Sequence, residues 1–178
     1  MKPESGLVDL KEPIKDNPAF QDLKRGLTPF YVPDFTGSVF QEAFDFKNHL
    51  LNLNWETRRT ARHEYFMSDK FRSYTYGNRG LGEELYKSKP FTVEVAALLK
   101  AANKILGTEF NVCFLNKYDD EHQHLGWHAD DFKGMRQDQP IAVISYGAER
   151  EIWFKKKDYK GKVPPEGKCL LEDGSLLS

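Results

Sequence analysis

Short segments in which apolar and polar side chains alternate recur along the chain after residue 55. A period of two residues is that of a β-strand with one buried face, and turns rich in glycine, proline and aspartate separate the segments. The first two segments are expected to form a hairpin around Ser68-Asp69-Lys70. The predicted strands lie at residues 56–67, 71–77, 110–118, 141–147, 150–156 and 168–173.

Two helices are expected beside these strands. One follows Gly37, where Ser38 can cap the first turn, and apolar residues among 40–51 fall roughly on one face. The other begins after Thr92 and ends at Gly107. Helices packed on one sheet of an antiparallel protein indicate an α+β fold that is mainly β, either a sandwich or a jelly roll. The apolar stripe of the second helix is Val95, Leu98, Leu99, Ala102 and Leu106.

Composition limits the classes of protein that this chain can represent. The 178 residues carry a net charge of −1, so contact with nucleic acid must come from local patches. Prolines among scattered charges indicate a weakly structured arm at residues 1–30, followed by one domain at 31–178. Cys113 and Cys169 are typical of buried free thiols, and the sequence shows neither a signal peptide nor a membrane-spanning run. We expect a monomer in the cytoplasm, or in the nucleus of a eukaryotic cell.

One face of the segment 110–118 ends in two polar residues. Alternation places Phe110, Val112, Phe114, Asn116 and Tyr118 on the same side, and the apolar members predict that this side faces inward. Buried amides and phenols need hydrogen-bond partners. A polar ligand would explain the two polar groups, and so would bonds to a neighbouring turn.

A His-x-Asp pattern follows this segment. His128 and Asp130 lie two residues apart on an extended stretch, so both side chains can contact one metal ion. Together with a distant second histidine, such a pair forms the facial triad of non-haem Fe(II) oxygenases. A closed zinc site is not indicated, because the cysteines lack paired spacing. The histidines interpreted as non-ligands are His49, His63, His122 and His124.

Several motifs occur in a characteristic order. They are Asn116-Lys-Tyr118, then Trp127-His128-Ala-Asp130-Asp131, then residues 140–147 and Arg150. Upstream of them lie the segment from Arg62 to Phe66 and Tyr74-Thr-Tyr76-Gly77. In this order, from about residue 50 to the end, the chain resembles the AlkB-type Fe(II)/2-oxoglutarate dioxygenases, which repair alkylated bases in DNA or RNA.

The resemblance implies a jelly-roll core with an iron site. Fe(II) would be held by His128 and Asp130, and 2-oxoglutarate would be contacted by Asn116 and Tyr118, with no further catalytic residue. With O2, the family hydroxylates the alkyl carbon, and the product separates into an aldehyde and the repaired base. The substrate-side residues that the likeness and the local pattern indicate are Arg62, Tyr65, Phe66, Tyr76, Trp127 and Asp131.

Two positions depart from the family's pattern. The family's third iron ligand, a histidine, and the arginines that hold the far carboxylate of 2-oxoglutarate would lie beyond Ser178. We therefore expect a longer native chain that supplies the final strands of the jelly roll, and little turnover by the 178 residues alone. Close relatives often place glutamate two residues after the iron-binding aspartate, where this chain has Phe132. Asp131 could replace that glutamate, or the lesion could differ.

Nucleic-acid contact has some support from the residues themselves. Arg58, Arg59 and Arg62 lie near Tyr65 and Phe66 in the sequence, and cations beside aromatic rings suit phosphate binding and base stacking. Core aromatics beside solvated arginines would produce the same pattern. Two alternative functions therefore stay open: the same iron chemistry on a protein or small molecule, and a non-catalytic nucleic-acid-binding form of the fold.

Overall fold

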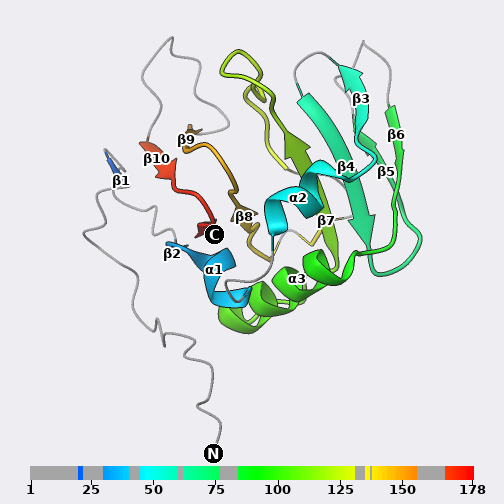
Figure 1. Ribbon diagram of the computed structural model, residues 1–178, viewed down its shortest axis with the longest axis horizontal. Coiled ribbons are helices and arrows are strands. Elements are labelled where there is room, and N and C mark those ends of the chain that lie inside the picture. The colour runs from blue at the N-terminus through cyan, green and yellow to red at the C-terminus, as the bar shows by residue number, and fades with distance from the viewer. Residues whose placement is uncertain are drawn as a thin grey trace, which may run out of the picture. The chain divides into compact units, whose positions relative to one another are not determined.

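The computed structural model describes most of the chain after residue 30, in two compact units. One unit comprises residues 48–139, and the other combines residues 1–47 with 140–178. All strand pairings are antiparallel among the described strands (Figure 1), which confirms a mainly β protein with few helices. The described residues are 20–21, 30–40, 45–59, 62–76, 84–130, 135–136, 138–155 and 167–178.

The unit of residues 48–139 is built on a three-stranded sheet in the order β3-β4-β7, beside a separate β5-β6 pair. The central strand β4 pairs with β7 over six residue pairs, from His63 opposite Lys117 to Ser68 opposite Val112. This register places Glu64 opposite Asn116. The strands are β3 (Glu56–Arg59), β4 (Arg62–Ser68), β5 (Ser73–Tyr76), β6 (Glu84–Lys87) and β7 (Val112–Lys117).

The expected hairpin around residues 68–70 is wrong. β4 pairs with β3 and β7, whereas β5 pairs with β6. β3 pairs with the first half of β4, and Lys89 bonds to the second half. The Lys89 N–H donates to Phe66 O at 2.8 Å, and its carbonyl accepts from Ser68 N at 3.0 Å. Because this bridge uses the backbone groups that the hairpin would need, β5 pairs elsewhere.

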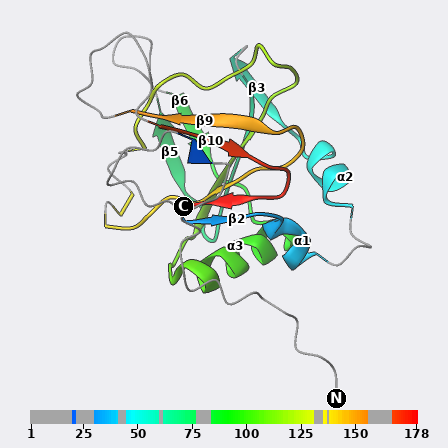
Figure 2. The same cartoon turned by 90° about the vertical axis from the view of Figure 1, so that its left-hand side faces the viewer.

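The helix α3 (Val93–Leu106) agrees with its prediction. The Thr92 side chain accepts a bond from Val95 N at 3.2 Å, and Gly107 ends the helix in the left-handed region at φ 64°. Figures 1 and 2 both show α3 below the strands of its own unit. Val95, Leu98 and Ala102 are its buried residues. No helix among the described residues is long and apolar enough to cross a membrane.

The helix expected after Gly37 is wrong in its bounds. Two short helices are found there, α1 (Phe35–Val39) and α2 (Phe46–Leu51). Ser38 lies inside α1 and does not cap it: its hydroxyl donates to Phe35 O at 2.6 Å. The physical reason is an earlier start, since Asp34 takes the N-cap position with φ 49°.

The second unit contains two small sheets, in the orders β1-β10-β9 and β2-β11-β8. Gly174 has φ 75° in the turn between β10 and β11, and a Cβ there would lie 2.5 Å from Thr36 Oγ1. Tyr31, Leu171 and Leu177 are buried in the core of this unit. The strands are β1 (Phe20–Gln21), β2 (Tyr31–Val32), β8 (Val143–Ile144), β9 (Arg150–Phe154), β10 (Gly167–Leu171) and β11 (Leu176–Leu177).

The two cysteines are free thiols, as expected. Cys169 is fully buried, whereas Cys113 is only partly buried as a residue. Desolvation raises the pKa of the Cys113 thiol to about 12 and that of Cys169 to about 11. Both therefore stay protonated at neutral pH.

Most of the arm predicted at residues 1–30 lies outside the described residues; β1 and Phe30 are the described parts.

Candidate metal and substrate site

The strand β7 carries the chain toward the candidate metal ligands. Val112, Phe114 and Asn116 share one face of β7, and Tyr118 follows its last residue. The prediction of a continuous inward row is wrong, because Val112 is 41% exposed and Asn116 is also exposed. The middle of the row is covered: the Tyr86 ring of β6 packs edge-on against Phe114 with centroids 5.2 Å apart.

His128 and Asp130 lie together in the loop that follows β7. The distance from His128 Nε2 to Asp130 Oδ1 is 3.6 Å. His128 Nδ1 lies 2.8 Å from the carbonyl oxygen of Gly126, which can only accept a hydrogen bond. The neutral imidazole therefore carries its proton on Nδ1, and its Nε2 lone pair faces the carboxylate. A carbonyl partner of this kind fixes the tautomer of metal-binding histidines.

These two side chains fit part of an iron site. An imidazole nitrogen and a carboxylate oxygen are the donors of a facial triad. Two ligand bonds of about 2.1 Å, as at zinc sites, span up to about 4.2 Å, so one ion can contact two atoms at the observed separation. Both side chains are partly exposed, which leaves room for further ligands. Among the residues that the structure describes, no group of three or more His, Cys, Asp or Glu could hold an ion.

Three of the competing histidines lie in the described part of the chain, in the loop after β7 and in α2. His122 is 86% exposed in its side chain, and His124 is exposed as well. His49 lies in α2, where its ring nitrogen is 3.0 Å from Thr92 Oγ1. Their interpretation as non-ligands stays a prediction.

A buried ion pair lies on the face of β4 that is aligned with Asn116. Arg62 Nη2 is 2.6 Å from Glu64 Oε1, and the Tyr86 hydroxyl donates to Glu64 Oε2 at 2.8 Å. Arg62 is 8% exposed and Glu64 3%. Arg62 Nε is buried and has no hydrogen-bond partner within the described part of the chain. A buried donor without a partner is uncommon in proteins, and an absent ligand is one explanation for it.

Aromatic rings lie beside this ion pair. Phe66 of β4 packs against Phe114 with ring centroids 5.7 Å apart. The Arg58 guanidinium lies over the Tyr86 ring, 4.1 Å from its centroid, and donates to Glu56. Arg58 therefore combines a ring contact with an ion pair, and it shares the Glu56 carboxylate with Lys89.

Of the other predicted substrate residues, Tyr65 and Trp127 have described side chains. Tyr65 lies on the opposite face of β4, where it contacts the Trp55 ring and Lys89 Nζ. Trp127 is 52% exposed. It lies in the loop after β7 that carries His128 and Asp130, which we call the ligand loop. Tyr76 belongs to β5, but its side chain and the whole of Asp131 lie outside the described residues.

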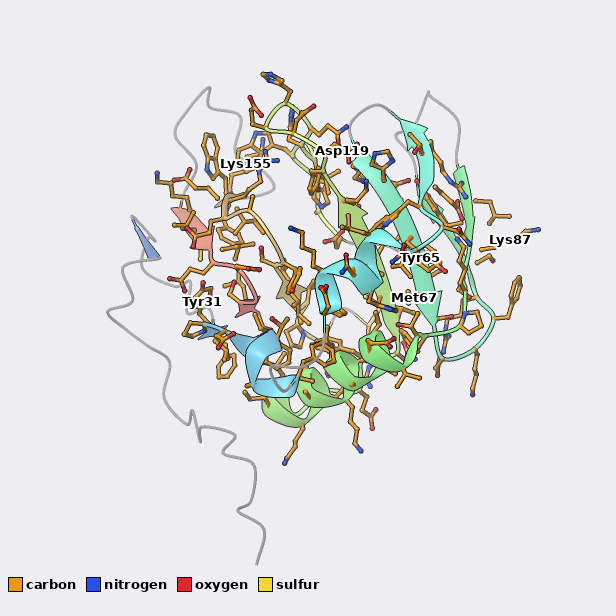
Figure 3. The ribbon with its side chains drawn as sticks, viewed as in Figure 1. Tyr31, Tyr65, Met67, Lys87, Asp119 and Lys155 are labelled. Carbon is orange, nitrogen blue, oxygen red and sulfur yellow. The ribbon has the colours of Figure 1, made fainter. Side chains whose placement is uncertain are left out.

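The sequence interpretation missed the residues around Asp119. The Asp119 carboxylate lies 2.8 Å from Lys117 Nζ and 2.5 Å from His63 Nε2. Its hydrogen bonds with Lys117 and then His63 lower the pKa of Asp119 to about 2, so the carboxylate is ionised at neutral pH. Figure 3 labels Asp119 beyond the end of β7. The spacing of Lys117 and Asp119 was a usable signal, but nothing in the sequence links either residue to His63.

Residues 13–178 match the family model of the 2OG-Fe(II) oxygenase superfamily. The chain belongs to this superfamily. The match includes the loop with His128 and Asp130 as well as the β4-β7 pair. Together with the relatives below, it confirms the resemblance to AlkB-type dioxygenases that the order of motifs predicts.

Curated relatives of this oxygenase chain carry the name DNA oxidative demethylase ALKBH2. The chain is 32% identical to the Bos taurus and Homo sapiens proteins over 111 residues, which are 58% of this chain and 40% and 42% of those proteins. It is 41% identical to the Arabidopsis thaliana protein over 61 residues, 34% of this chain and 19% of that protein. The matched region thus spans about two fifths of the length of the animal relatives.

The buried ion pair predicts a stability effect. Arg62→Met should lower the free energy of unfolding by about 3–5 kcal/mol, because it leaves the Glu64 carboxylate buried without its cation. The double variant Arg62→Met/Glu64→Leu should recover much of that loss. The control is Arg72→Met, which breaks the exposed pair with Asp69 and should cost about 1 kcal/mol or less. Urea unfolding measures all three; equal losses from the Arg62 and Arg72 variants would contradict the assignment.

The hydrogen bond of His128 predicts its tautomer. In the metal-free protein at alkaline pH, nitrogen NMR of the imidazole should show His128 protonated on Nδ1, because Gly126 O can only accept. Exposed His122 is the internal control and should show the tautomer mixture of a solvated ring. A His128 ring protonated mainly on Nε2 would refute the orientation on which the metal assignment rests.

Proposed function

We propose that this protein performs Fe(II)- and 2-oxoglutarate-dependent oxidative dealkylation of alkylated bases in nucleic acid. The observation that carries the proposal is the pair of His128 and Asp130, with the Nε2 lone pair of the histidine facing the carboxylate at 3.6 Å. Membership of the 2OG-Fe(II) oxygenase superfamily supports Fe(II), 2-oxoglutarate and O2 as the cofactor and co-substrates.

His128 and Asp130 would hold the iron, and Asn116 and Tyr118 would contact 2-oxoglutarate. Bound Fe(II), with 2-oxoglutarate and O2, supplies the oxidation of an alkyl C–H bond. The protein residues bind and orient. Asn116 is exposed at the end of its strand and offers an amide, and Tyr118 is half-buried just beyond it and offers a hydroxyl.

The substrate base would be received on the face of β4 and β6 that carries Arg62, Phe66 and Tyr86. The Arg62 Nε–H offers a donor to an acceptor atom of the base, and the rings of Phe66 and Tyr86 lie beside the Arg62–Glu64 pair. Glu64, which accepts a hydrogen bond from the Tyr86 hydroxyl, holds the Arg62 guanidinium in place. A base must leave the duplex to meet these groups, since they are buried.

DNA is the first candidate for the nucleic acid. The relatives named above are described as DNA oxidative demethylases, and the chain shares 32% identity with two of them over 111 residues. RNA stays an alternative substrate. We also propose a jelly-roll architecture for this chain, as the sequence motifs lead us to expect.

The test is oxidation of an alkylated oligonucleotide by the full encoded protein. Iron-dependent release of succinate and aldehyde should be abolished by His128→Ala and by Asp130→Ala, with folding intact because both side chains are partly exposed. His122→Ala is the matched control: it removes an exposed histidine of the same loop and should keep full activity.

The other outcomes separate the alternatives. Succinate release without a change in the oligonucleotide would favour the same iron chemistry on a protein or a small molecule. Binding of the oligonucleotide without iron-dependent turnover would favour the non-catalytic form of the fold. Full activity in either ligand variant would refute the iron assignment itself.

A further inference from the structure

Four side chains from three strands and one loop meet at the start of the ligand loop. Asp119 accepts from Lys117 Nζ at 2.8 Å and from His63 Nε2 at 2.5 Å. On the other side of the ring, His63 Nδ1 lies 2.6 Å from Thr57 Oγ1. Lys117 belongs to β7, His63 to β4 and Thr57 to β3, so the whole β3-β4-β7 sheet contributes to the contact.

The hydrogen-bond directions within this group are mutually consistent. A carboxylate can only accept, so His63 donates to Asp119 through Nε2–H. In the neutral ring, Nδ1 then accepts from the Thr57 hydroxyl. If the ring is protonated, Nδ1–H donates to the same hydroxyl oxygen. The contact with Asp119 therefore survives in both charge states of His63.

Asp119 also begins a chain of bonds inside the loop. Its backbone N–H donates to Gln123 Oε1 at 2.8 Å. The Asp120 carboxylate accepts from the N–H groups of His122 and Gln123, at 2.8 and 3.1 Å. These bonds close a compact turn between Asp119 and Gln123. The turn lies directly after Tyr118 and leads to His128 in the same loop.

We propose that Asp119, which accepts hydrogen bonds from His63 and Lys117, is a positioning residue that anchors the start of the ligand loop to the β3-β4-β7 sheet. The inference rests on the proposed function for its consequence, the alignment of Tyr118, His128 and Asp130 with their ligands. Asp119 itself touches neither metal nor co-substrate. A carboxylate is ionised at neutral pH in any case, and the hydrogen bonds from Lys117 and His63 lower the pKa of Asp119 to about 2, so both bonds stay available in mildly acidic solution as well.

The experiment uses two disruptive variants and two controls. Asp119→Asn removes the charge, and His63→Leu removes the donor from β4. His63→Gln is the conservative variant, since its amide N–H can still reach the carboxylate. Asp69→Asn is the matched control. Asp69 is also an exposed aspartate of this unit in an ion pair, and its carboxylate accepts from Arg72 Nη2 at 2.9 Å. It follows the end of β4 opposite to His63.

The first readout needs no metal. Amide hydrogen exchange should show faster exchange at His122 and Gln123 in Asp119→Asn and His63→Leu, with little change in His63→Gln and Asp69→Asn. Unchanged exchange in both disruptive variants would overturn the proposal. This result does not depend on whether the protein is an oxygenase.

The second readout is the affinity of the full encoded protein for Mn(II) and 2-oxoglutarate, measured by calorimetry. Substituting a residue that orients metal ligands typically weakens metal affinity by about 10–100-fold. We expect the lower end, a loss of roughly 10-fold, for Asp119→Asn and His63→Leu. The KM for the oligonucleotide should not change. Loss of loop protection with unchanged affinity for both ligands would overturn the positioning role. Failure of the unaltered protein to bind either ligand would instead overturn the proposed function. Amide hydrogen exchange would then be the sole test of whether Asp119 anchors the loop.

Discussion

The antiparallel pairing of β4 with β7 is the constraint on which the candidate site depends. Six consecutive residue pairs fix the register, so Glu64 must lie opposite Asn116 and Phe66 opposite Phe114. A slip of one residue would turn every one of these side chains to the other face. The register thereby aligns the proposed base-binding face of β4 with the proposed 2-oxoglutarate contact on β7, and it brings His63 to the level of Lys117, next to Asp119.

Several charges of this unit lie in ion pairs. Arg62 is matched by Glu64 and Lys117 by Asp119, whereas Arg58 shares the Glu56 carboxylate with Lys89. The guanidinium of Arg62 is therefore already paired with a carboxylate of its own strand. Its remaining Nε–H donor suits recognition of a base better than long-range attraction of phosphates, because long-range attraction needs unbalanced charge.

Local signals explain which features the sequence could predict. The cap at Thr92 and the stop at Gly107 depend on neighbouring residues, and so does the alternation of β7. The His-x-Asp pair needed only the spacing of two residues on an extended chain, and the structure brings its two side chains together. The face of β4 that carries Arg62 and Glu64 could have been found by the same period of two.

Long-range contacts explain what the sequence could not predict. The failed hairpin depended on Lys89, which reaches the edge of β4 from beyond β6. The contact between His63 and Asp119 joins residues 56 positions apart, and no local pattern indicates it. The inward row on β7 failed for a related reason: Tyr86 covers Phe114, whereas Val112 and Asn116 are exposed, and that depends on where β6 lies.

The most direct measurement is a structure of the full encoded protein with a redox-stable divalent ion, Mn(II), and 2-oxoglutarate. The account predicts one ion in contact with His128 Nε2 and the Asp130 carboxylate, while His128 Nδ1 keeps its bond to Gly126 O. An ion held by His122 and His124, or an ion at His63 and Asp119 with none at His128, would contradict it.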